Sequence, residues 1–500
     1  MVAMGIRAPK ISNWMKRLSL WAVVILGLPL LFNSCKKEPN GIDTPEPEPP
    51  ATEDELVFPK KEMRAVWVTT AWGLDWPRGD YSEASQKQQY IAYLDRFKEL
   101  NINAVFFQVK AMGDAYYASS YEPWSVSITG TRGKTPGYDI LEFMINEAHA
   151  RDIEFHAWMN PYRIATRANT GTSYPALHAS VESEWVVSHE KIQIYNPALP
   201  AVRERLTNIV KELITSYPVD GIHFDDYFYP AASAAGQMVS DHDDYAHYGA
   251  AYSTIEDFRR GNVDQAIKAV YDAIVATRPE VVFSVSPAPN RDYNYNTVFA
   301  DVAKWCKEGW VDIVIPQLYQ EIGNSYNDFQ ANLGYWSQYS YDAALMIGHG
   351  YYKFGEPTAP AAFQSTEELV KQFDLTQRNE KVVGNAMYSA RYILENKIQV
   401  TDKLATIYKY PAVMPMVGRA VSPAPVEATG ITIANDQLKW SAPEDVRSVV
   451  YYFSDLTKEG VVYAITDQKN IAVDEVGHYS VSTLNMDNNE SEPSDVVEKR

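Results

Sequence analysis

The chain has 500 residues, of which 46% are hydrophobic and 22% charged, so it can bury a sizeable core and is long enough for one large domain plus at least one small one. Its formal net charge of -19 at pH 7, with no basic run, argues against a nucleic-acid partner, because so acidic a surface repels phosphates. The two cysteines, Cys35 and Cys306, are too few for a disulfide framework or a zinc cluster.

The N-terminal segment has the pattern of an export signal. Basic Lys16 and its neighbour precede an apolar run over 18–32, and Cys35 follows shortly after it. A run of about 15 apolar residues is too short for a comfortable membrane span. We therefore expect residues 1–34 to be a lipoprotein-type signal peptide, with Cys35 lipidated as a membrane anchor. That places the protein in the cell envelope as an outer-membrane lipoprotein, facing either the periplasm or the outside.

Residues 35–58 alternate proline with acidic side chains, a composition that cannot bury apolar surface and predicts a disordered, extended linker.

From residue 59 to 418, short β-branched runs alternate with amphipathic helical patterns, as in βα units around a parallel sheet. The expected strands are 63–70, 102–109, 153–158, 221–225, 281–286, 313–318, 344–348 and 382–387, and helical patterns include 86–100, 140–151, 202–217 and 263–277. This order predicts an α/β fold, a (β/α)8 TIM barrel, with an open doubly wound sheet as the alternative. No G-x-G-x-x-G motif follows the first strand, so a dinucleotide fold gets no support.

Residues 424–500 change in texture to short strands separated by polar turns. This rhythm predicts a C-terminal fibronectin type III-like β-sandwich, with Trp440 and Tyr479 as core aromatics. Either a passive structural module or a carbohydrate-binding module fits the pattern. Cys306 lies in an apolar helical stretch, which predicts a buried, inert thiol.

Polar side chains stand repeatedly where the barrel strands are expected to end, which is where barrel enzymes carry their active sites. They are Lys110 and Asp114 after the second strand, Trp158, Asn160 and Arg163 after the third, His223, Asp225 and Asp226 at the fourth, Ser286 at the fifth, Gln317, Tyr319 and Glu321 after the sixth, His349 after the seventh, and Tyr388 and Arg391 after the eighth. Because these ends meet around one rim, together they predict a site.

Strand alternation singles out Asp225. Along 221–225, Ile222 and Phe224 should face the helices, which leaves His223 and Asp225 facing the barrel axis. Asp226 then lies at the mouth. Two adjacent acids at such a place can be catalytic, can bind a metal or can cap the following segment.

Glycoside hydrolysis needs one protonated carboxyl and one ionised carboxyl. Asp225 fits the nucleophile or base. For the acid we favour Asp226, then Asp114, with Glu321 and the more distant Glu122 as further candidates. Each of these acids can instead form a salt bridge with one of three nearby cations, Lys110, Arg163 and Arg391.

The expected sugar contacts come from amide, hydroxyl, imidazole and indole side chains. Asn160, Gln317, Tyr319 and His223 would position the sugar, and Trp72, Trp76, Trp124 and Trp158 would stack on it. We expect no cofactor. We also expect no metal, because His242 and His247 stand at i, i+5, which puts their rings on different faces of a helix.

Five stretches resemble the glycosyl hydrolase-like 10 family: EMRAVWVTTAWGLDWP (62–77), FFQVKAMGDAYYASSYEPWS (106–125), FHAWMNPYR (155–163), VDGIHFDDYFYP (219–230) and VDIVIPQLYQ (311–320). The resemblance implies an exported (β/α)8 glycosidase fold, related to hydrolases of peptidoglycan glycan strands that lack stem peptides. The family's strand 4 acidic motif falls on Asp225 and Asp226, its strand 2 acid on Asp114, and its strand 3 Asn and Arg on Asn160 and Arg163.

One departure from the family is Lys110, where Arg is common, so the bidentate grip of Arg on a substrate carboxylate is lost. A polysaccharide with carboxylates would be repelled by this acidic protein unless cations such as Arg163 make the barrel mouth locally less negative. The competing hypothesis is a non-catalytic glycan-binding lipoprotein on the same barrel, because strand 5 ends in Ser286-Pro287 and lacks the Glu that many barrel glycosidases use as acid.

Overall fold

In the computed structural model, the described residues are 56–167, 173–232, 236–419 and 422–500. The predicted signal peptide, Cys35 and all but the last residues of the predicted linker lie outside these ranges. Within them, no helix combines the length and the apolar character needed to cross a membrane.

Eight parallel strands close into a barrel in the order β1-β11-β10-β9-β8-β7-β3-β2. They are β1 (Met63–Val68), β2 (Ala104–Lys110), β3 (Glu154–Met159), β7 (Gly221–Phe224), β8 (Val282–Val285), β9 (Ile313–Val314), β10 (Ala344–His349) and β11 (Val382–Tyr388). Each one overlaps a predicted strand. The TIM barrel is therefore confirmed, and the alternative of an open doubly wound sheet is wrong because β1 pairs with β11.

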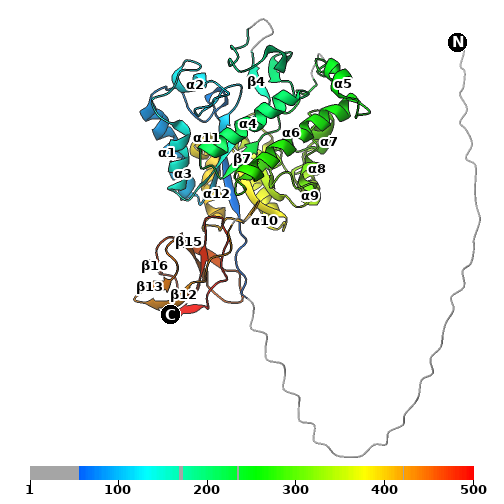
Figure 1. The fold of residues 1–500 in the computed structure, drawn as a ribbon. Coiled ribbons are helices and arrows are strands. Elements are labelled where there is room, and N and C mark those ends of the chain that lie inside the picture. The colour runs from blue at the N-terminus through cyan, green and yellow to red at the C-terminus, as the bar shows by residue number, and fades with distance from the viewer. Residues whose placement is uncertain (1–55, 168–172, 233–235, 420–421) are drawn as a thin grey trace, which may run out of the picture. The chain divides into compact units, whose positions relative to one another are not determined.

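Helices surround the strands, as Figure 1 shows. They are α1 (Glu83–Glu99), α2 (Val126–Thr129), α3 (Ile140–His149), α4 (Pro200–Ser216), α5 (His242–Tyr248), α6 (Ile255–Thr277), α7 (Arg291–Asn296), α8 (Val302–Lys307), α9 (Phe329–Tyr339), α10 (Glu367–Gln377), α11 (Ala390–Glu395) and α12 (Val400–Ile407). The 3- to 4-residue spacing of the apolar side chains buries one face of α4 against the sheet; these residues are Val202, Leu206, Val210 and Leu213. Cys306 is buried in α8, as expected.

The barrel wall separates two apolar layers. Ile222 and Phe224 belong to the cluster packed between strands and helices, whereas Trp67 and Phe106 belong to the cluster inside the barrel. The predicted alternation along β7 is therefore confirmed, and His223 and Asp225 point inward.

One element was not predicted. Between β3 and α4 the chain forms an antiparallel sheet in the order β4-β6-β5, from β4 (Arg163–Thr166), β5 (Val186–His189) and β6 (Ile192–Tyr195). Since β4 begins only four residues after β3 ends, this sheet starts directly at the mouth of the barrel.

The C-terminal segment forms two antiparallel sheets. One holds β12 (Thr429–Ala434), β13 (Gln437–Ser441) and β16 (Asn470–Ala472), and the other holds β14 (Arg447–Phe453), β15 (Val461–Thr466), β17 (Gly477–Leu484) and β18 (Val497–Lys499). Trp440 and Tyr479 lie in the shared core, and the Tyr479 hydroxyl donates to Glu475 O at 2.7 Å. The three-plus-four arrangement and this tyrosine corner confirm the fibronectin type III-like sandwich.

Candidate active site

Asp225 follows the last residue of β7 and is only 3% exposed. Both carboxylate oxygens are held: Trp158 Nε1 donates to Oδ2 at 3.1 Å, and Asn160 Nδ2 donates to Oδ1 at 2.9 Å. Burial raises the pKa of Asp225 to about 7, an effect that Arg163 opposes and the neighbouring Asp226 increases. This carboxyl therefore titrates near neutral pH.

The side chain of Asn160 can adopt only one orientation. Its Oδ1 accepts hydrogen bonds from the backbone N–H groups of Tyr162, at 3.2 Å, and Arg163, at 2.7 Å. The amide nitrogen must therefore face Asp225. A completely buried amide fixed in this way gives Asp225 a rigid hydrogen-bond donor.

Asp226 is more exposed than Asp225 and reaches the mouth. Gln317 Nε2 donates to Asp226 Oδ1 at 3.2 Å and also to the backbone oxygen of Ser286 at 3.0 Å. Burial raises the pKa of Asp226 as well. Burial and the charge of Asp226 also raise the pKa of Tyr293, which places that ring in the same electrostatic environment.

Arg163 lies between two exposed aromatic rings. Its guanidinium carbon is 4.4 Å from the ring centroid of Tyr227 and 6.0 Å from that of Trp72, and Nε donates to Ala111 O at 3.2 Å. Trp72 is 67% exposed and Tyr227 is 52% exposed. Among the described residues, Arg163 forms no ion pair. Arg163 is itself only 8% exposed, and its charge acts to lower the pKa values of Asp225 and Asp226.

Tyr227 was missed at the level of sequence, although its position directly after the two acids was a usable signal.

His223 occupies a deeper level of the barrel axis. Trp67 Nε1 donates to His223 Nε2 at 3.1 Å, and Nδ1 lies 2.8 Å from Ser284 Oγ. Burial lowers the pKa of His223 well below its usual value, so the ring is neutral. With both nitrogens used inside the barrel, the completely buried ring does not fit the predicted contact with a sugar.

Two of the three expected cations are also occupied elsewhere. Lys110 is completely buried, and its Nζ donates to Met112 O at 2.9 Å, which does not fit the predicted contact with a substrate. Arg391 Nε lies 2.6 Å from Glu395. Arg163 is thus the predicted cation that the structure places at the mouth.

The other acid candidates differ in access. Asp114 is 7% exposed and lies 3.6 Å from Arg132 in an ion pair, and burial raises its pKa. Glu122 is 2% exposed and pairs with Lys110 at 3.7 Å. Of the shortlist, Asp226 directly follows Asp225 in the chain, and its charge raises the pKa of Asp225.

The structure places the aromatic residues that were predicted to contact the sugar in different surroundings. Trp158 donates to Asp225, and Tyr319 stacks on Tyr388 with ring centroids 5.7 Å apart. Trp124 is partly buried against the core. The prediction that Trp76 stacks on sugar is wrong, because the ring is completely buried and its Nε1 donates to Gln86 O.

The sequence model of the family described as glycosyl hydrolase-like 10 matches residues 62–365. The glycosyl hydrolase YngK of Bacillus subtilis is 35% identical over 398 residues, 75% of this chain and 78% of that protein. The chain belongs to the glycosyl hydrolase-like 10 family. The glycosyl hydrolase DigH of Escherichia coli strain K12 is 33% identical over 416 residues, covering 75% of this chain and 94% of that protein. The glycoside hydrolase domain of PgaB (BpsB) from Bordetella bronchiseptica aligns with a TM-score of 0.45 at 11% identity, covering 69% of this chain and 98% of that domain.

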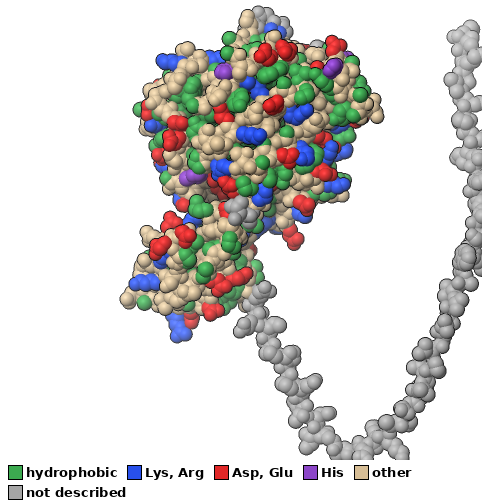
Figure 2. Space-filling view, in the orientation of Figure 1, with side chains coloured by type: hydrophobic (Ala, Val, Ile, Leu, Met, Phe, Trp, Pro, Cys, Tyr) green, Lys and Arg blue, Asp and Glu red, His purple; other side chains and the backbone are tan. Residues whose placement is uncertain are grey.

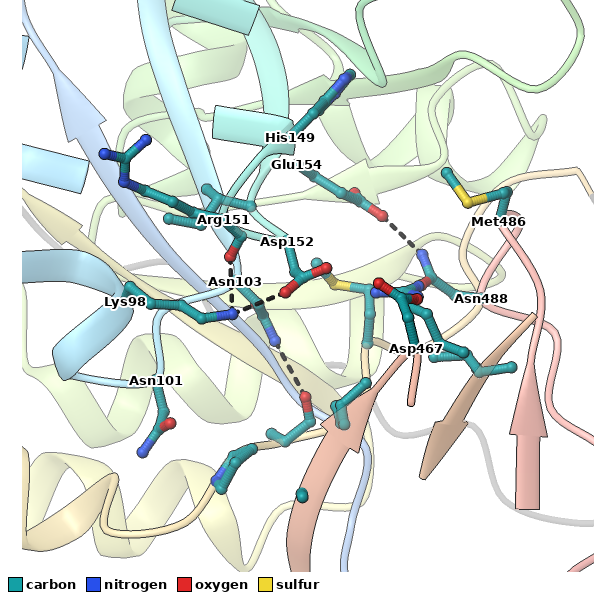
Figure 3. A pocket seen from close by; sticks show the side chains of 18 of the residues that line it. Lys98, Asn101, Asn103, His149, Arg151, Asp152, Glu154, Asp467, Met486 and Asn488 are labelled. Carbon is teal, nitrogen blue, oxygen red and sulfur yellow. Dashed lines mark hydrogen bonds and ion pairs between the residues drawn. The ribbon is translucent and has the colours of Figure 1, made fainter. Parts of the chain in front are cut away.

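This member of the family also has a cavity of about 660 Å³ far from Asp225, lined by residues that precede the barrel strands and by residues of the sandwich (Figure 3). Its polar side chains bond to one another: Lys98 to Asp152 at 2.8 Å, and Glu154 to Asn488 at 2.6 Å. Barrel enzymes place their chemistry at the other end of the strands. The paired acids at the mouth are therefore the better candidate.

On the face drawn in Figure 2, acidic and basic side chains are interspersed, and neither sign forms a broad patch. In the described part of the chain, no three His, Cys, Asp or Glu side chains converge as metal ligands would.

Proposed function

We propose that this member of the glycosyl hydrolase-like 10 family is a glycoside hydrolase that cleaves O-glycosyl bonds with Asp225 and Asp226. The observation that carries the proposal is the pairing of two carboxyls at the mouth in unequal surroundings. Burial raises both pKa values, and the charge of Asp226 raises that of Asp225 further, so the pair retains a proton near neutral pH. Hydrolysis requires one protonated and one ionised carboxyl at the same time.

The hydrogen bonds favour a division of roles. Donors from Trp158 and Asn160 onto both oxygens of Asp225 stabilise its ionised form and suit a nucleophile or base. Asp226 is more exposed and has a single side-chain donor, so it suits the acid that protonates the leaving oxygen once the proton shared by the pair has passed to it. Burial of Asp225 works against its ionisation, and the balance leaves its pKa at about 7.

The pH dependence of kcat/KM tests this division. If Asp225 acts in its ionised form, activity rises with pH and has an acidic limb with an apparent pKa of about 7. A fall of activity through the same pH range would reverse the roles of the two acids. Undiminished release of reducing ends by Asp225→Asn would exclude the mechanism altogether.

The substrate that we propose is an anionic glycan, of which peptidoglycan strands without stem peptides are the example suggested by the family resemblance. Arg163 would bind a sugar carboxylate such as the lactyl group of N-acetylmuramic acid, while Trp72 and Tyr227 stack on ring faces. Release of reducing ends from denuded glycan strands should be lost in Asp225→Asn and reduced in Arg163→Gln. Equal rates on a neutral chitin oligosaccharide would contradict the anionic substrate.

The second candidate function is binding of a glycan without hydrolysis. It is favoured by Ser286, a buried residue that stands at the end of β8 where many barrel glycosidases carry an acid. Sedimentation with insoluble peptidoglycan separates the two functions. Binding by the unaltered protein without any release of reducing ends would support this alternative.

We also propose that Cys35 carries the lipid that anchors the protein in the cell envelope, on the strength of the apolar run and the cysteine that follows it. Labelling of cells with a palmitate analogue should mark the protein, and Cys35→Ala should abolish the mark. An unlabelled protein would contradict the anchor.

A further inference from the structure

Lys110 is the last residue of β2, and Asn160 directly follows the neighbouring strand β3. The register between β2 and β3 shifts between Gln108 and Lys110, so the bulged β2 pairs Lys110 with Met159. As a result, the backbone N–H of Asn160 donates to Lys110 O at 2.8 Å, and Lys110 Nζ lies 3.5 Å from Asn160 O. Bulges beside active sites commonly redirect a side chain. Here the bulge places both backbone polar groups of Asn160 against the same lysine.

The charge of Lys110 is held in a buried cluster of side chains. Its Nζ lies 3.7 Å from Glu122 Oε1, which is also 3.7 Å from Arg205 and accepts a hydrogen bond from the Tyr195 hydroxyl at 2.9 Å. Burial lowers the pKa of Lys110, and Glu122 opposes that effect. Among the described residues, Glu122 Oε2 has no hydrogen-bond partner. Removing charged groups from water costs free energy, so the presence of this buried cluster does not by itself indicate that it stabilises the fold.

The cluster is connected to the candidate site through one residue. Asn160 donates to Asp225 through Nδ2, and its Oδ1 accepts from the backbone N–H of Arg163. A displacement of the Asn160 backbone would therefore move the donor away from Asp225 and move the start of the Arg163 segment with it. Misplacement of a reacting group by about 1 Å can lower a rate on the order of 100-fold.

We propose that Lys110 is a positioning residue for Asp225, acting through the backbone of Asn160, and that Glu122 keeps Lys110 charged in this place. The inference rests on the proposed hydrolase function. Lys110 does not touch the substrate, because its side chain is completely buried. Its role is to hold the amide donor of Asn160 in the single orientation that faces the carboxyl.

A double-mutant cycle tests the proposal. Lys110→Met and Asn160→Ala should each lower kcat, on the order of 10- to 100-fold, while KM changes less than about 3-fold. The double variant should be no slower than Asn160→Ala, because Lys110 acts only through the Asn160 amide, which Asn160→Ala has already removed. Additive losses in the double variant would overturn the proposal.

Arg64→Met is the matched control. Arg64 is also a buried cation, 2.8 Å from Glu62, but it stands near the beginning of β1, at the end of the barrel away from the mouth. The substitution Arg64→Met should lower the melting temperature of the protein without changing kcat. If Arg64→Met lowers kcat as Lys110→Met does, the effect of Lys110 is general loss of packing and the proposal is wrong.

A second measurement does not need activity. In protein labelled with 13C at aspartate carboxyls, the Asp225 signal, assigned by its loss in Asp225→Asn, should titrate at higher pH in Lys110→Met, since a donor to the ionised form is weakened. An unchanged midpoint would overturn the positioning role. This titration is independent of turnover. A failure of the hydrolase proposal would show instead as no release of reducing ends by the unaltered protein, or as full activity of Asp225→Asn.

Discussion

Replacement of Asp225 by Asn should remove a specific part of the pH dependence of stability. Burial raises the pKa of Asp225 from 3.8 to about 7, so the native state holds a proton that the unfolded chain releases. Its contribution to stability is complete below pH 3.8, declines as pH rises, and is lost above about 7. A shift of about 3 units corresponds to about 4 kcal/mol over the whole range, of which about 2.5 kcal/mol falls between about pH 5 and 8.

Urea unfolding followed by tryptophan fluorescence at about pH 5 and pH 8 measures this difference. The amide introduced by Asp225→Asn would set an N–H group against one of the two donors, Trp158 or Asn160, at a cost of about 1–3 kcal/mol that is the same at both pH values. The informative quantity is therefore the loss of stability between the two pH values, which should be about 2.5 kcal/mol smaller in Asp225→Asn. Asp467→Asn, at an exposed acid, is the control. Parallel pH curves for the unaltered protein and Asp225→Asn would refute the reasoning.

Three further substitutions test other parts of the structure. Trp72→Ala removes a ring that is 67% exposed, so the melting temperature should hardly change, while KM for the glycan should rise about 10-fold. An unchanged KM would contradict the stacking role. Gly221→Ala would place a methyl group 2.1 Å from Nδ1 of the buried His156, so thermal unfolding should show a free energy of unfolding lower by about 1–3 kcal/mol. An unaltered free energy of unfolding would contradict the packing. Tyr479→Phe deletes the hydrogen bond to Glu475, and calorimetry should show a loss of about 1 kcal/mol, confined to the sandwich if the two domains unfold separately.

Most of the fold follows from short-range patterns. The eight barrel strands were predictable because each is a β-branched apolar run that ends in polar residues, and the alternation along β7 gave the direction of His223. The predicted strand 313–318 shortens to Ile313–Val314 because Pro316 has no N–H for the ladder, and Gln317 keeps only an isolated bridge to Gly348. The sheet of β4, β5 and β6 escaped prediction because its four-residue strands carry mixed polar and apolar side chains.

The sequence patterns do not indicate how deep inside the barrel each side chain lies. Lys110 and Arg163 are both cations near strand ends, so the sequence patterns gave the same prediction for both, a place at the rim of the barrel. The bulge in β2 and the distant partner Glu122 bury Lys110, whereas Arg163 begins β4 at the mouth. The stagger of strands around a barrel decides the level at which each side chain lies, and that stagger depends on pairing between segments far apart in the chain.

The surroundings of Asp225 show the same dependence on distant residues. Its two side-chain donors, Trp158 and Asn160, both come from the β3 segment, two residues apart and therefore on the same, inward face. The acidic motif on β7 thus supplies the carboxyl, while the neighbouring strand sets the pKa and orientation of that carboxyl. Substitutions in the β3 segment should consequently shift the acidic limb of the pH profile. The shift should be larger than that caused by equally conservative substitutions in β7 that leave the two acids in place. A pH profile that responds only to substitutions in β7 would show that the donors of the β3 segment do not control Asp225.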